Sequence, residues 1–138
     1  MGLAERRIAT DFQTNHYPAL KKKIDDAAGF DVPMEVRWNT LADADPRYVK
    51  GWTDGWPKVY FAPIIEAFKL IARDQMGKDA LRGGIKQIVV QNTKSSYSSD
   101  WAKFEPANGV LTLDCQYANV DSIKDRTDVL VKELEKSL

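Results

Sequence analysis

The stretch DWAKFEPANGVLTLDCQ, residues 100–116, decides the fold that this sequence predicts. Two segments of alternating apolar and polar residues flank Pro106-Ala107-Asn108-Gly109. An Asn-Gly pair readily adopts the positive φ angles that a tight turn between antiparallel strands requires. We therefore predict a β-hairpin. Alternation assigns one face of its second strand to the core, namely Leu111, Leu113, Cys115 and Tyr117.

Two further strands are predicted upstream of this hairpin. IKQIVVQ, residues 85–91, is rich in β-branched residues and lies between a glycine pair and a polar run, which indicates a central strand. Around residues 32–38, apolar and polar residues alternate, which indicates a strand with one buried face. Pro33 cannot donate a ladder hydrogen bond, so it belongs at the start or on an edge of that strand.

Helical periodicity fills most of the remaining sequence. The apolar spacing predicts helices over 3–15 and 18–28, with a break or a fresh first turn at Pro18 and a stop at Gly29. Another helix is predicted from Pro63, ending near Gly77 or one turn later at Gly83-Gly84. A long helix is predicted after Asn119, which can cap it, through to residue 138.

This order of elements predicts a single α+β domain spanning residues 1–138. We expect a sheet of about four strands, largely antiparallel, with the helices packed on one face and a long C-terminal helix. If helices cover only one face of the sheet, the other face must be polar, dimeric or ligand-binding.

Composition excludes several classes of function. The 138 residues include 20 basic and 20 acidic side chains, so no overall positive field attracts a nucleic acid. The sequence has no apolar stretch of signal-peptide or membrane-spanning length, which predicts a protein that does not enter the membrane. One cysteine and one histidine allow neither an intrachain disulfide nor a Cys/His metal cage. We therefore expect a cytoplasmic protein without a metal or cofactor.

The sequence holds no specific catalytic motif, and it predicts no catalytic residue. Cys115 falls on the apolar face of its strand, which is typical of a small core residue, and His16 lies where a helix gives way to a turn. No G-x-S-x-G nucleophile elbow is present. Glu35 and Asp114 would suit acid/base or metal chemistry if they faced each other, but both also fit the polar face of a sheet.

An aromatic segment, residues 48–60, is the candidate binding element. Tyr48, Trp52, Trp56 and Tyr60 recur at intervals of four, but Gly51, Gly55 and Pro57 interrupt the helix that this spacing suits. The rings have three interpretations: core between the second helix and the sheet, a partner interface, or the floor of a pocket. Tyr, Trp and Arg are the residues enriched in binding hot spots, and Arg47 adjoins the segment.

We therefore hypothesise a non-enzymatic module that forms a homodimer or binds a protein partner through the aromatic segment and the exposed sheet face. The alternative is a small-molecule-binding protein or small enzyme with a pocket between the sheet and the second helix. In that alternative, Trp52, Trp56 and Tyr60 line the pocket, and Arg37 or Arg47 is its polar anchor.

Overall fold

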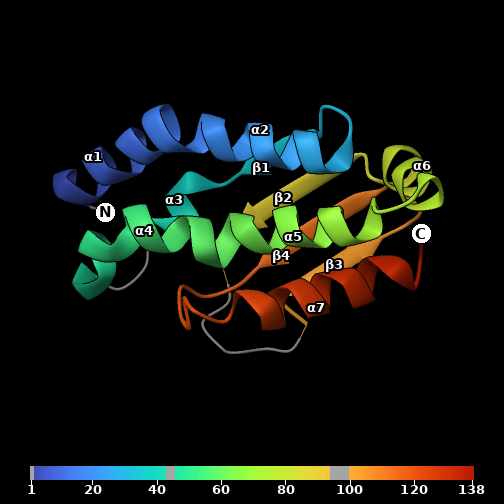
Figure 1. Cartoon of the computed structure of the whole chain (residues 1–138). Coiled ribbons are helices and arrows are strands. Elements are labelled where there is room, and N and C mark those ends of the chain that lie inside the picture. The colour runs from blue at the N-terminus through green and yellow to red at the C-terminus, as the bar shows by residue number, and fades with distance from the viewer. Residues whose placement is uncertain (1, 43–45, 94–99) are drawn as a thin grey trace.

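The computed structural model describes residues 2–42, 46–93 and 100–138. Helices and a four-stranded sheet form one α+β unit (Figure 1). In chain order, the elements are α1 (Leu3–Asp11), η1 (Phe12–His16), α2 (Tyr17–Ala28), β1 (Met34–Val36), α3 (Trp38–Leu41), η2 (Pro46–Gly51), α4 (Trp52–Trp56), η3 (Pro57–Phe61), α5 (Ala62–Ile71), α6 (Gln75–Gly84), β2 (Gln87–Gln91), β3 (Ala102–Glu105), β4 (Val110–Asp114) and α7 (Ile123–Glu135).

The sheet is mixed, with the strand order β1-β2-β4-β3. The β3–β4 hairpin is antiparallel, as the sequence predicts, but β1 pairs with β2 and β2 pairs with β4 in parallel. The prediction of a largely antiparallel sheet is therefore wrong. The helices between β1 and β2 supply the crossover that parallel strands require. β3 follows β2 in the sequence but lies on the outer edge of the sheet, beyond β4.

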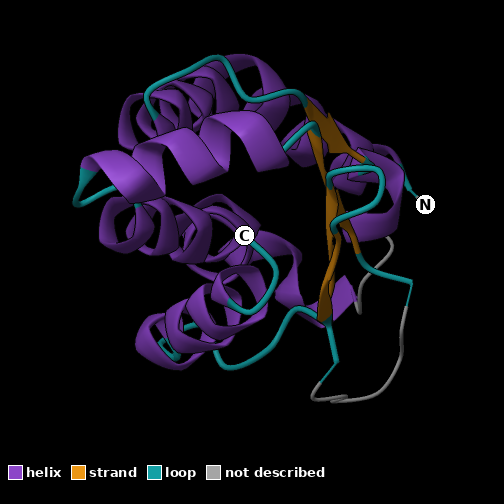
Figure 2. Ribbon diagram, turned by 90° about the vertical axis from the view of Figure 1, so that its right-hand side faces the viewer, coloured by secondary structure: helices purple, strands orange, loops and turns teal. Residues whose placement is uncertain are grey.

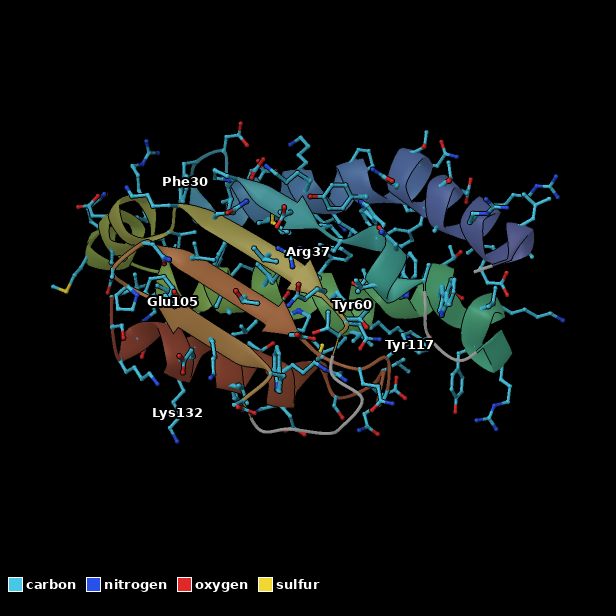
Figure 3. All side chains as sticks on the ribbon, turned by 180° about the vertical axis from the view of Figure 1, so that it is seen from behind. Phe30, Arg37, Tyr60, Glu105, Tyr117 and Lys132 are labelled. Carbon is cyan, nitrogen blue, oxygen red and sulfur yellow. The ribbon has the colours of Figure 1, made fainter. Side chains whose placement is uncertain are left out.

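Helices pack against one face of this sheet (Figure 2). Alternation along the strands directs Ile88, Val90, Leu111 and Leu113 into the core beneath α2, α5 and α7. Viewed from the other side, the strands lie in front with no helix across them (Figure 3). The prediction that helices cover one face is consistent with both views, and the opposite face remains open.

Two long helices each pass through a π turn instead of breaking at proline. Pro18 and Pro63 occupy the second position of α2 and α5, directly after the π turns η1 and η3. The residues before these helices share nearly the same backbone angles: φ −118° and ψ −42° at His16, and φ −116° and ψ −43° at Phe61. A proline ring clashes with the carbonyl four residues earlier, and the wider π turn relieves that clash.

The other helix boundaries also differ from the predicted ones. Gly77 does not end a helix: α5 ends at Ile71, and Gly77 lies in the first turn of α6, where its N–H donates to the Asp74 side chain at 2.8 Å. Asn119 does not cap α7, because α7 begins at Ile123 and Ser122 occupies the N-cap position. Asn119 lies in the preceding loop with a φ of +50°. The long C-terminal helix is present, and it packs against α5 and β3.

Candidate functional site

The aromatic segment belongs mostly to the core. Trp52, Trp56 and Tyr60 are 0% exposed, whereas Tyr48 keeps 48% exposure on η2. Trp56 lies at the centre of a ring cluster: its centroid is 5.0 Å from that of Trp52, 5.1 Å from Phe12 and 5.9 Å from Trp38. These rings therefore join η1, α3 and α4. Of the four aromatic residues of the segment, only Tyr48 is exposed enough to contact a partner.

Two indole nitrogens in this cluster are buried without a hydrogen bond. Nε1 of Trp52 and Nε1 of Trp56 find no acceptor among the described residues. Tyr60 differs, because its hydroxyl donates to the carbonyl oxygen of Cys115 at 3.1 Å. Burial raises the pKa of Tyr60. The uncharged Tyr60 hydroxyl thus links the aromatic segment to the end of β4 through this hydrogen bond.

The two glycines that interrupt the segment make room for Tyr117. The Tyr117 hydroxyl donates to the carbonyl oxygen of Gly51 at 3.1 Å. A Cβ atom at Gly55 would lie 2.0 Å from that hydroxyl oxygen. Gly51 and Gly55 therefore allow α4 to pack against the loop after β4. No local sequence pattern predicts this contact.

A groove of about 660 Å³ opens beside this contact. Its walls are Tyr48 and residues 116–122, and the ring centroids of Tyr48 and Tyr117 are 6.0 Å apart. Gln116 lines the groove, and its Oε1 is buried from solvent without a hydrogen-bond partner in the described chain. Arg47 lies on the outer side, with its guanidinium carbon 5.7 Å from the Tyr48 centroid. Arg47 and Tyr48 are thus near each other, but Arg37 is elsewhere.

Arg37 belongs to a polar chain at the carboxyl ends of the parallel strands. Its guanidinium donates to Glu35 at 3.0 Å and to Oε1 of Gln91 at 2.6 Å. Gln91 in turn donates to Asp114 at 3.0 Å, and Asp114 also accepts the N–H of Thr93 at 2.7 Å and the Thr93 hydroxyl. Glu35 and Asp114 therefore do not face each other directly but are joined through Arg37 and Gln91. Asp114, only 6% exposed, holds strand ends together.

Cys115 and His16 do not form a dyad. Cys115 is 8% exposed, as its predicted strand face requires, and burial raises the pKa of its thiol to about 12. His16 has a 43% exposed side chain on η1, where Nε2 lies 3.4 Å from Asp11. No hydrogen bond joins the two residues in the described part of the chain. A thiol that stays protonated at neutral pH is a poor nucleophile.

The open sheet face carries alternating charged, polar and small apolar groups. Glu35, Val89, Thr112 and Lys103 are paired in register, so they form one row across all four strands. Neighbouring rows hold Gln87, Val110 and Glu105 on one side, and Arg37, Gln91 and Asp114 on the other. Val89 is 7% exposed but lies outside the contiguous core. This face is predominantly polar.

Both edge strands, β1 and β3, have features that disfavour pairing with a strand of another molecule. β1 has only three residues and follows Pro33. On β3, the outward N–H of Phe104 donates to Glu133 of α7 at 3.2 Å. Partial burial opposes ionisation of Glu133, but hydrogen bonds from Lys136 and from that N–H lower its pKa overall. Short edges and edge-covering side chains disfavour edge-to-edge association.

Two further properties bear on the class of protein. Within residues 2–42, 46–93 and 100–138, no three His, Cys, Asp or Glu side chains come together as metal ligands would. No helix in those ranges has both the length and the apolar character needed to cross a bilayer. The chain matches no protein-family model, no curated protein and no solved structure.

Proposed function

We propose that this protein is a non-enzymatic interaction module that self-associates through its open sheet face. One observation carries the proposal: β1, β2 and β4 are parallel, yet one of their faces bears no helix. All-parallel sheets occur almost only with both faces covered, whereas antiparallel sheets commonly leave one face in water, so the three parallel strands of this mixed sheet favour a covering on the open face. A second protein surface on the open face would complete that covering.

The aromatic segment contributes less to this interaction than its composition suggests. Three of its four rings are fully buried, so in this conformation they support the fold beneath the interface. The sheet face replaces them as the binding surface. Four strands at about 4.8 Å spacing, each up to about 17 Å long, present a face of roughly 320 Å², well below the roughly 800 Å² that each partner buries in a standard interface, so the contact is weak. We therefore expect a dissociation constant between about 1 μM and 1 mM.

Sedimentation velocity over a concentration series tests this function. We expect a monomer–dimer equilibrium in the parent protein and a shift to monomer in Thr112→Arg, because Thr112 lies at the centre of the face. Thr10→Arg, the same change on the exposed surface of α1, serves as the matched control and should leave the equilibrium unchanged. A parent protein that stays monomeric up to about 1 mM would contradict the proposal.

The groove beside Tyr48 favours a second candidate function, the binding of a small polar molecule such as a saccharide. Its volume of about 660 Å³ falls within the range of small-molecule sites. Two tyrosine rings offer apolar faces, and a turn of the Gln116 side chain would bring its buried, unpartnered Oε1 into the groove to accept from a ligand hydroxyl. Leaving such an acceptor without a partner costs about 1–3 kcal/mol, which a bound donor would recover.

Titration with glucose and with N-acetylglucosamine, followed by NMR, tests this second function. We expect the Gln116 side-chain amide to shift, and the Gln116→Leu variant to lose the accompanying shifts of the Tyr48 ring. The amide of Gln13, which is exposed on η1, is the internal control and should not move. An unchanged Gln116 signal at about 10 mM of either sugar would reject a saccharide site with a dissociation constant of 1 mM or below.

A further inference from the structure

We infer that the partner on the open face is a second copy of this chain, related by a two-fold axis parallel to the strands. This inference rests on the proposed self-association and specifies its geometry. The inference is based on one row of residues across the sheet, which has an acidic residue on one edge strand and a basic residue on the other: Glu35, Val89, Thr112 and Lys103. Both end residues are exposed.

The charges of Glu35 and Lys103 determine the direction of the two-fold axis. A two-fold axis parallel to the strands, midway between facing sheets, exchanges the two edges but preserves the level along each strand. Glu35 of one copy then faces Lys103 of the other, and symmetry repeats this pair. An axis along the row would instead place Glu35 opposite Glu35 and Lys103 opposite Lys103. Like charges across an interface are unfavourable, so the first arrangement is selected.

The local contacts leave both charges available. Arg37 donates to Glu35 through Nε and Nη2, both directed at Oε2, and the Glu35 side chain still keeps 47% exposure. Lys103 is exposed on β3, where it lies close enough to Glu133 to lower the pKa of that residue. Glu133 itself is paired with Lys136 at 2.8 Å, so a second carboxylate can approach Lys103 from the open side.

The distances suit this pairing. Edge strands three spacings apart are separated by about 14 Å, so each edge lies about 7 Å from the axis. Aligned sheet packing turns the two sheets by about 30°, which displaces the edges by about 4 Å. A lysine side chain can span that displacement. Val89 and Thr112, next to the axis, then face each other in the centre of the interface.

Charge reversal and charge exchange test the arrangement by sedimentation velocity. Glu35→Lys alone and Lys103→Glu alone should each weaken the dimer about tenfold, because each places like charges together twice. The double variant, Glu35→Lys with Lys103→Glu, should recover the parent dissociation constant. Lys23→Glu, the same charge change on the exposed surface of α2, controls for net charge and should leave the constant unchanged.

The outcomes separate this arrangement from self-association itself. A monomeric parent would overturn both. A dimer that Thr112→Arg dissociates, but that the single charge reversals leave intact, would keep the sheet-face interface and overturn the two-fold pairing. Failure of the double variant to recover while both singles weaken the dimer would also overturn the pairing, since it would show that the two residues act on different contacts.

Discussion

Replacing Trp56 with alanine is expected to lower the free energy of unfolding by about 3–5 kcal/mol, the usual cost of truncating a buried large aromatic side chain. Trp56 is 0% exposed and contacts Phe12, Trp38 and Trp52. Its removal would leave a cavity among elements that are distant in sequence. Denaturant unfolding followed by far-ultraviolet circular dichroism measures this loss.

Tyr48→Ala is the matched control, because it truncates a ring in the same segment that is 48% exposed. We expect a change within about 0.5 kcal/mol there. Trp56→Phe should fall between the two variants, since it keeps most of the ring and removes an indole N–H that has no acceptor among the described residues. A loss below about 1 kcal/mol in Trp56→Ala would show that the ring is not a core residue.

Gly77→Ala is expected to destabilise the protein by about 2 kcal/mol, although alanine favours a helix over glycine by about 1 kcal/mol. A Cβ atom at Gly77 would lie 1.6 Å from the carbonyl oxygen of Ile71, which is backbone and cannot rotate aside. The added methyl group must therefore push α6 away from the end of α5. Thermal and denaturant unfolding would both register this change.

Gly83→Ala supplies the control within the same helix. Apart from its chain neighbours and the backbone of its own helix, no atom lies within 4 Å of a Cβ atom built there, so helix propensity alone should act. We expect a gain of up to about 1 kcal/mol. If Gly77→Ala stabilised the protein as Gly83→Ala does, the close approach of Gly77 to the Ile71 carbonyl would be incorrect.

The sequence predicts local features of this fold well. The β3–β4 hairpin, the buried Leu111 and Leu113 of β4 and the helix after β4 all follow from short-range patterns, and the structure contains each of them. The turn differs from the predicted one, because in the Asn-Gly pair only Gly109 has a positive φ, +72°. Strand order is different, because β2 and β4 are neighbours in the sheet although β3 lies between them in the sequence. No residue pattern within β2 or β4 predicts which strand will lie beside it.

The site shows the same division between local and distant information. Spacing identifies the four rings at Tyr48, Trp52, Trp56 and Tyr60 but does not decide between core and surface, because an aromatic side chain serves both. Burial depends on Phe12 and Trp38, which reach the segment from other elements. The row that joins Glu35 to Lys103 depends on the register of four strands, and the sequence alone does not give that register.

The cluster of Trp38, Trp52 and Trp56 also has a spectroscopic consequence. Trp38, Trp52 and Trp56 are near neighbours, whereas the fourth tryptophan, Trp101, lies just before β3. Rings this close couple electronically and transfer excitation among themselves, so we expect the coupled part of the near-ultraviolet dichroism to come from this corner of the molecule. A chain whose hairpin had opened while this corner stayed closed would therefore keep that dichroism, and the opening would register in the emission of Trp101 instead.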